Sequence, residues 1–272
     1  MVGHVEWVQF ARVERIPRAG EVAHARDAFE EPAGGGAVAA VQLARLTGAA
    51  VLVSALGEDE LARRSLARLR ELGVDVRAAA RPGETRKAVT LVDAEGERTI
   101  TTFGARLQPN REDEELPWSE IATIDGVYFT AGDAAALQAA RAARVLVASP
   151  RAGDALGHGV PLDALVLSED DAIERHEASR ARDEAALVVF TEGERGGRYR
   201  ERAGGSGTWT AVSPPADPVD SYGCGDSFAA GLTYGLAAGM TVPAALAVAA
   251  RCGAVCLTGR GPYERQLTGG EL

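Results

Sequence analysis

Hydrophobic residues along this chain fall into short apolar runs that alternate with segments of helical spacing. The short runs, which suit buried strands, cover residues 126–130, 145–148, 164–167 and 186–191. Helical patterns fill residues 134–143 and 172–184 between them. Because strands that alternate with helices form parallel β-α-β units, the pattern predicts a three-layer α/β/α sandwich with a mostly parallel central sheet.

The N-terminal half continues this alternation. Residues 1–11 alternate imperfectly and suit a first strand, which would end near Glu6 in the centre of the sheet. The apolar run 37–46 predicts a buried helix that ends at Gly48, and residues 49–55 predict a strand. From 59 to 72, leucines share one face and arginines the other, which is typical of an amphipathic helix that covers a sheet.

A different pattern lies between residues 87 and 102. Two extended segments, 87–93 and 97–102, flank the turn Ala94-Glu95-Gly96 and predict a β-hairpin. A hairpin added to an α/β body usually forms a lid or an edge. No linker or internal repeat divides the 272 residues, so we expect a single domain that spans 1–272.

Composition narrows the possible partners. The chain has 46% hydrophobic and 25% charged residues, as in an ordinary globular protein, and a formal net charge of −10. Nucleic acid is an unfavourable partner, because phosphate backbones are bound by clustered Lys and Arg. ATP is not excluded, since a helix N-terminus and a metal ion provide local positive charge.

Cysteine usage and hydropathy indicate a cytoplasmic location. The three cysteines form no C-x-x-C pair, so we expect no disulfide framework. Charged residues interrupt any signal-peptide core near the N-terminus, and the apolar run 242–250 is too short to cross a bilayer. We therefore expect no membrane partner.

The segment 217–239 carries the candidate chemistry. Pro214, Pro215 and Pro218 favour an extended approach, two glycines permit a tight turn, and a helical apolar pattern then begins near Asp226. The backbone N–H groups of Gly223, Cys224, Gly225 and Asp226 would point into one space at the positive end of that helix, which favours an anion.

Asp226 has two interpretations. As a base, it would accept the proton of a hydroxyl that attacks a phosphate held by this anion hole. As a structural residue, it would cap the helix N-terminus, since Asp is among the best N-cap residues. The short motif G-x-G-D alone does not decide between them.

Longer motifs support the catalytic interpretation. Residues 220–228, Asp-Ser-Tyr-Gly-Cys-Gly-Asp-Ser-Phe, resemble the second signature of the ribokinase-like (PfkB) kinase family, D-T-x-G-A-G-D-[ST]-F, with Ser and Cys as departures. Residues 34–48 resemble the glycine-led first signature of that family, and 56–59 with 72–75 resemble the block that follows it. Together with 191–196, similar to a nucleotide-binding turn, these segments span most of the chain.

The resemblance implies an ATP-dependent, Mg²⁺-requiring kinase that transfers the γ-phosphoryl group to a hydroxyl of a small sugar, sugar-like or nucleoside substrate. It is also compatible with a monovalent cation such as K⁺ as a second cofactor. It implies Asp226 as base and the anion hole Gly223, Cys224 and Gly225. The ATP site would include Thr191, Gly193, Gly196 and Gly253. Segments 8–31 and 85–103 would form a β-lid, through which many relatives form homodimers.

The acceptor and metal positions depart from the family pattern. Glu6, Gly35 and Gly36 are the candidate substrate residues, but Glu6, Val8 and Ala39 stand where relatives carry Asn or Asp. Glu6 would bind a hydroxyl, or would be a solvated charge at a strand end. Glu169 and Asp171 replace the family's N-x-x-E element; they would recruit Mg²⁺ through water, or form the acidic first turn of a helix.

Two other functions fit parts of the sequence. Residues 34–39 fit the dinucleotide motif G-x-G-x-x-[GA], but they follow Glu30-Glu31-Pro32 and not a predicted strand, which argues against an oxidoreductase. A ribokinase-like sugar- or nucleotide-binding protein without catalytic activity stays open, because a fold does not guarantee a function.

Overall fold

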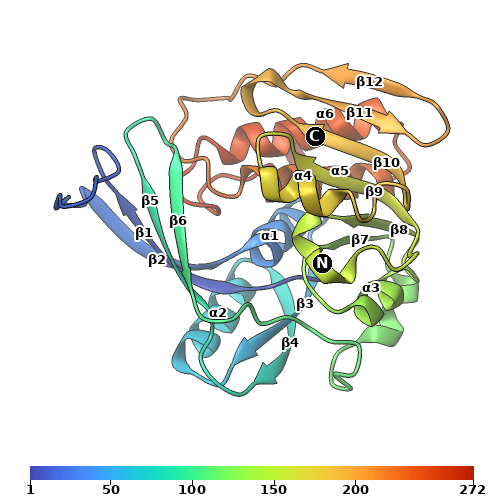
Figure 1. Ribbon diagram of the computed structural model, residues 1–272, viewed down its shortest axis with the longest axis horizontal. Helices are drawn as coiled ribbons and strands as arrows, with labels where there is room; N and C mark the ends of the chain where they lie inside the picture. The colour runs from blue at the N-terminus through green and yellow to red at the C-terminus, as the bar shows by residue number, and fades with distance from the viewer.

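The computed structural model describes residues 1–272, which form a main β-sheet and a smaller second sheet (Figure 1). The main sheet contains β3 (Ala50–Gly57), β4 (Val74–Arg81), β7 (Gly126–Phe129), β8 (Val145–Ala148), β9 (Leu162–Ser168), β10 (Ala185–Thr191), β11 (Gly197–Glu201) and β12 (Ser206–Trp209). Six of them lie in the order β12-β11-β10-β9-β8-β7, and Val2 bridges β7 to the β3-β4 pair. All neighbours from β7 to β10 are parallel, as are β3 and β4.

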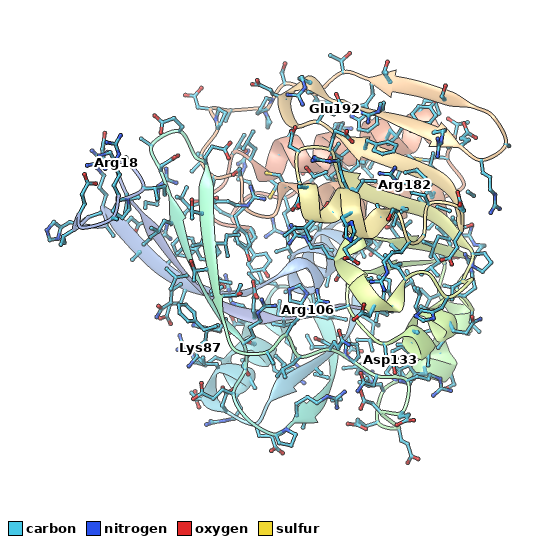
Figure 2. All side chains as sticks on the ribbon, viewed as in Figure 1. Arg18, Lys87, Arg106, Asp133, Arg182 and Glu192 are labelled. Atoms are coloured by element: carbon cyan, nitrogen blue, oxygen red, sulfur yellow. The ribbon has the colours of Figure 1, made fainter.

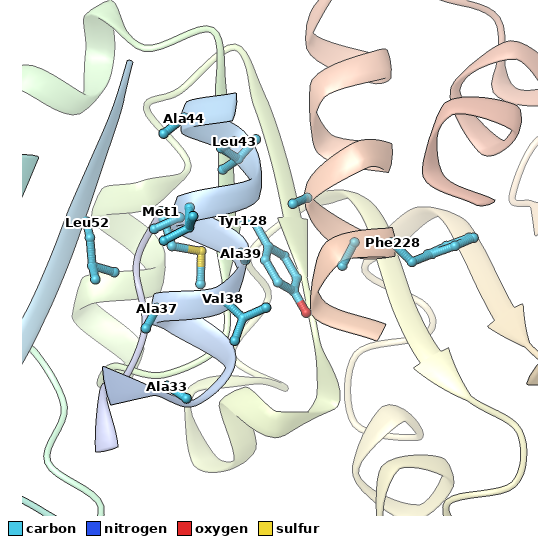
Figure 3. Packing of buried hydrophobic residues seen from close by; sticks show 14 of the residues in the cluster. Met1, Ala33, Ala37, Val38, Ala39, Leu43, Ala44, Leu52, Tyr128 and Phe228 are labelled. Carbon is cyan, nitrogen blue, oxygen red and sulfur yellow. The ribbon is translucent and has the colours of Figure 1, made fainter. Parts of the chain in front are cut away.

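Helices cover both faces of the main sheet. One face packs against α1 (Gly35–Thr47), α2 (Glu60–Glu71), α5 (Cys224–Ala237) and α6 (Val242–Cys256), the other against α3 (Ala134–Ala140) and α4 (Ala172–Ala178). Consecutive strand residues therefore enter different cores. Tyr128 lies between α1 and α5 (Figure 3), whereas Phe129 belongs to the other core, together with Leu137 of α3. The predicted three-layer sandwich is confirmed.

Some helices end earlier than the apolar pattern predicts. The expected segment 172–184 is helical only to Ala178, and 134–143 only to Ala140. After α4, the Ser179 hydroxyl donates to the His176 carbonyl at 2.6 Å. This side-chain bond satisfies a carbonyl that would accept a backbone N–H if the helix continued. Short 3₁₀ segments fill connections at η1 (Trp118–Thr123), η2 (Pro150–Ala155), η3 (Gly193–Arg195) and η4 (Gly269–Glu271).

The second sheet projects from the main body beside α1 and α2 (Figure 1). It contains β1 (Glu6–Arg12), β2 (Asp27–Ala33), β5 (Lys87–Val92) and β6 (Arg98–Phe103) in the order β2-β1-β5-β6. The β5–β6 pair is antiparallel, which confirms the predicted hairpin, and β1 pairs with β5 in parallel. The two segments expected to form a lid thus share one sheet.

The predicted first strand is wrong in extent. Val2 belongs to the main sheet, but the strand that begins at Glu6 belongs to the second sheet, so Glu6 does not end a central strand. The break lies at Gly3, where an added Cβ would approach Thr130 Oγ1 to 2.5 Å and Gly36 Cα to 2.8 Å. The chain leaves the main sheet through this narrow passage beside α1.

None of the helices combines the length and the apolar composition needed to cross a membrane.

Candidate active site

The loop 220–223 enters α5 in a conformation that its own residues fix. Gly223 is the N-cap of α5 with φ +83°, and a Cβ there would approach Val38 Cγ1 to 2.9 Å. Asp220 is buried, and its two carboxylate oxygens accept from Tyr222 N at 2.9 Å and Gly261 N at 3.0 Å. A left-handed glycine and a doubly bonded carboxylate therefore hold the loop in place.

Several backbone donors of this loop have no acceptor within the protein. The N–H groups of Gly223, Gly225 and Asp226 make no hydrogen bond, and that of Cys224 makes a long one to Ser221 O at 3.5 Å. Gly225 costs helix stability relative to Ala, yet the space above it is empty to 4 Å. Free N–H groups at the positive end of a helix, with no Cβ above them, suit an anion such as a phosphate.

Asp226 is the third residue of α5 and does not cap it, so the N-cap interpretation is wrong. Its carboxylate makes no hydrogen bond to the protein. Burial raises the pKa of Asp226 to about 6; the carboxylates of Glu174 and Glu6 act in the same direction, and Arg151 and Arg98 oppose it. A carboxyl group with this pKa is ionised at neutral pH and still accepts a proton readily.

The glycine turn between β2 and α1 lies directly against Asp226. A Cβ on Gly35 would lie 2.9 Å from Asp226 Oδ1, and one on Gly36 would meet His4 O at 2.5 Å. Gly34, with φ +87°, lies beside Glu6: a Cβ added to Gly34 would lie 3.3 Å from Glu6 Cγ. The structure therefore brings the sequence-predicted substrate residues Glu6, Gly35 and Gly36 together with the candidate base.

Glu6 is buried, with 6% of its surface exposed, so the interpretation as a solvated charge is wrong. Arg86 Nε lies 3.5 Å from Glu6 Oε2. Burial raises the pKa of Glu6, while the guanidinium groups of Arg86, Arg106 and Arg151 act against this rise. Because a buried charge is costly unless it is paired, the Glu6 carboxylate and the arginines around it compensate one another's charge, which a solvated surface carboxylate does not need.

The sequence analysis did not identify four arginines near this space: Arg86, Arg98, Arg106 and Arg151. Arg106 Nη1 donates to Arg151 O at 2.7 Å, and Arg151 in turn pairs with Asp171 and Glu174. Arg98 of β6 donates to Ser221 Oγ at 3.1 Å. They come from separate segments without a shared motif, so nothing in the local sequence links them.

The predicted ATP residues come from two parts of the fold. Thr191 ends β10, and Gly193 and Gly196 lie in the β10–β11 turn, both with positive φ. Gly253 of α6 would place a Cβ 3.3 Å from Cys224 O. The β11–β12 hairpin reaches α5 as well, since Trp209 stacks on Phe228 with ring centroids 5.7 Å apart.

The predicted metal residues are both engaged in ion pairs. Glu169 pairs with Arg198 at 3.0 Å, and Asp171 caps α4 and pairs with Arg151 at 2.8 Å. No group of three or more His, Cys, Asp or Glu side chains is placed to hold a metal by itself. Glu174, 13% exposed, is the carboxylate with the largest effect on the pKa of Asp226, which it raises. This set fits a Mg²⁺ that arrives bound to nucleotide phosphates.

Two surface clefts of about 450 and 510 Å³ lie along β10 and β11 and do not include Asp226. The assignment of the site therefore rests on its converging groups and not on cavity size.

Known proteins show the same architecture. The family model of pfkB family carbohydrate kinases matches residues 1–268. The ATP-dependent ribose-1-phosphate kinase of Halopiger xanaduensis is 30% identical over 272 residues, which cover 93% of this chain and 89% of that protein. Ribokinase from Giardia lamblia superposes with a TM-score of 0.78 at 18% identity, covering 99% of this chain and 95% of the other.

A ribokinase from Arabidopsis thaliana, solved with ribose and ATP, superposes with a TM-score of 0.68 at 18% identity, covering 99% of this chain and 95% of the other. At such identities these structures establish the fold, while the family match spans nearly the whole sequence. The chain belongs to the pfkB family of carbohydrate kinases, phosphotransferases whose acceptor is a hydroxyl group.

Proposed function

We propose that this protein transfers the γ-phosphoryl group of ATP to a hydroxyl of a small sugar or sugar-like molecule, with Asp226 as the base. The observation that carries the proposal is the pairing of this carboxylate, whose pKa burial raises to about 6, with free N–H groups in the same helical turn. A base and an anion hole at one helix N-terminus provide the two functions that phosphoryl transfer to an alcohol needs.

In this mechanism the acceptor lies over the glycine turn 34–36. The absence of a side chain at Gly35 leaves room beside Asp226 Oδ1 for the attacking hydroxyl. Asp226 accepts the hydroxyl proton as the oxygen attacks the γ-phosphorus, and the bond from that phosphorus to the β,γ-bridging oxygen breaks to release ADP. The N–H groups of Gly223, Gly225 and Asp226 stabilise charge on the transferred group. Thr191, Gly193, Gly196 and Gly253 border the nucleotide.

Mg²⁺ would neutralise charge on the ATP phosphates. We place its water ligands beside Asp226 and Glu174, because Glu174 is the carboxylate that acts most strongly on the pKa of Asp226. Like Glu169 and Asp171, Glu174 also pairs with an arginine, in its case Arg151 at 2.7 Å. A dependence on K⁺ stays a prediction, which replacement of K⁺ by Na⁺ in the assay tests.

The test is ADP formation from Mg-ATP with a panel that includes ribose, ribose 1-phosphate and nucleosides, since relatives are named for ribose and ribose 1-phosphate. We expect Asp226→Ala to lower kcat/KM about 10²- to 10⁴-fold, the range typical of a lost general base. Asp217→Ala, which removes an exposed carboxylate nearby, is the matched control and should change little.

The outcome that would contradict the proposal is turnover that survives Asp226→Ala. If no acceptor gives any turnover, the alternative of a sugar- or nucleotide-binding protein without catalytic activity replaces it. Binding of ATP and sugar by calorimetry would then still be observed.

We further propose that the second sheet acts as a lid and as a dimer interface. The β6 strand is an edge with a partner on one side only, and its exposed side chains include Ile100 and Phe103. An apolar, unpaired edge favours pairing with a second copy. Light scattering should give the mass of a dimer, and Ile100→Lys should shift it toward the monomer; a monomeric parent protein would contradict this.

A further inference from the structure

Arg86 and Arg106 have no role in the transfer of a phosphoryl group to a neutral sugar, yet both face the acceptor side of the site. Arg106 forms no ion pair with any carboxylate within 4.0 Å, and its one hydrogen bond goes to the backbone carbonyl of Arg151 at 2.7 Å. Figure 2 shows it near the middle of the molecule, where the second sheet meets the main body. An unpaired, half-buried guanidinium is costly to retain without a ligand.

The hydrogen bonding of Arg86 is also incomplete. Its Nε is buried and has no hydrogen-bond acceptor, because the nearest carboxylate oxygen, Glu6 Oε2, lies 3.5 Å away. Its Nη2 donates to Thr102 Oγ1 at 2.8 Å, which fixes the direction of the guanidinium. The side chain is therefore held in position with a donor still available.

The two guanidinium groups also repel one another. Burial lowers the pKa of Arg106, and the positive charges of Arg86 and Arg151 lower it further, with Glu6 as the opposing carboxylate. Arg151 pairs with Asp171 and Glu174, and Glu6 pairs with Arg86, which leaves Arg106 as the one of the three without an ion-pair partner. A bound anion would remove this imbalance.

The position of the pair relative to Asp226 matches a small substrate. Asp226 lies against Gly35, and Glu6 with its partner Arg86 lies against Gly34. The Cα atoms of these two glycines are ~3.8 Å apart, as for any consecutive residues. A molecule the size of a sugar ring, with its hydroxyl at Asp226, thus extends toward Arg86. Arg106 lies close enough to Arg86 and Glu6 for their charges to act on its guanidinium.

We propose that Arg86 and Arg106 bind a phosphate group carried by the acceptor, so that the substrate of this kinase is a sugar phosphate. The inference rests on the proposed function, because it places the acceptor by the base Asp226. Two guanidinium groups from different segments fit the separated oxygens of a tetrahedral phosphate better than the single plane of a carboxylate. Arg151 supports the site indirectly, through the carbonyl that holds Arg106.

The experiment compares kcat/KM for ribose 1-phosphate, ribose 5-phosphate, ribose and ribonate in the parent protein and in Arg106→Gln. We expect a sugar phosphate to be preferred, and Arg106→Gln to lower its kcat/KM roughly 10- to 100-fold, mainly through KM, as for a lost charge-assisted contact. Activity with ribose should change by less than about threefold, since no contact to it is lost. Arg70→Gln, on the solvent-facing side of α2, is the matched control.

Other outcomes separate this inference from the proposed function. Equal kcat/KM for neutral and phosphorylated sugars, a preference for ribonate, or an equal loss for all acceptors in Arg106→Gln would overturn the phosphate site while leaving the kinase intact. If the parent turns over no acceptor, titration of ribose 1-phosphate into parent and Arg106→Gln decides the site alone. Binding that weakens in the variant supports it, and unchanged or absent binding overturns it.

Discussion

Asp226 must be ionised to act as a base, although its surroundings disfavour the charge. Because burial raises its pKa to about 6, kcat/KM should fall about tenfold per pH unit below that value. Glu174 raises the pKa of Asp226 and also neutralises Arg151, which lowers it. Glu174→Gln should therefore move this acid limb to lower pH, and Arg151→Gln should move it to higher pH.

The measurement is kcat/KM from pH 5 to 8, roughly the range around this pKa, at saturating ATP. Glu177→Gln, one turn further along α4, is the matched control and should leave the limb in place. Protonation of ATP would affect all variants equally, so a limb that stays at one pH in every variant would show that it does not belong to Asp226.

Single residues differ in how far the sequence predicts them. Asp226, Gly35 and Gly36 lie within signatures whose spacing is local, so their roles can be inferred from the sequence alone. Arg86 and Arg106 lie apart from those signatures and meet Glu6 only after three segments fold together. Their contribution depends on tertiary distance, which a local pattern does not encode.

The loop that leads into α5 depends on Gly223 in two ways, by its positive φ and by its close contact with Val38. Gly239 has a similar φ of +73° after the end of α5, but the space around it is open. Both Gly223→Ala and Gly239→Ala should destabilise the fold by about 1–2 kcal/mol through φ strain, and Gly223→Ala by more because of the overlap. Only Gly223→Ala should also lower kcat/KM.

Urea unfolding and ADP formation, measured on the same preparations, check this expectation. Equal stability and full activity of Gly223→Ala would mean that the anion hole tolerates a different loop conformation.

At the level of elements, the sequence predicts those that depend on local patterns but not the long-range pairing of strands. The β5–β6 hairpin follows from its alternation and its glycine turn, and the sequence predicts all four strand boundaries to within one residue. The parallel pairing of β1 with β5 joins residues about eighty positions apart and has no local signal. For the same reason, the pattern of residues 1–11 predicts one strand although they serve two sheets.

The two sheets meet at the loop that leads into α5, so acceptor binding beside this loop affects the whole molecule. Gly96, in the β5–β6 turn, accepts from Ser221 N at 3.0 Å, and Arg98 donates to Ser221 Oγ. Arg12 of β1 donates to Val219 O at 3.2 Å, and Arg260 forms two bonds with Asp27 of β2. The exposed strand β6 and the β5–β6 turn are thus held against this loop by polar contacts, whereas β1 packs into the main core through Phe10, whose ring centroid lies 4.9 Å from that of Tyr222.

The polar contacts of β6 and the β5–β6 turn should form and break without unfolding either sheet. We expect hydrogen exchange in residues 85–103 to slow when the acceptor and a non-hydrolysable ATP analogue bind together, because closure protects the β5–β6 amides and excludes water that would hydrolyse ATP. Residues 134–140 of α3, which pack on the opposite face of the main sheet, provide the internal control. Arg98→Ala removes one contact across the junction and should reduce the protection while raising ATP hydrolysis without acceptor. Unchanged exchange at saturating ligand would show that the second sheet is a fixed wall of the site, in which case water must be excluded by the acceptor itself.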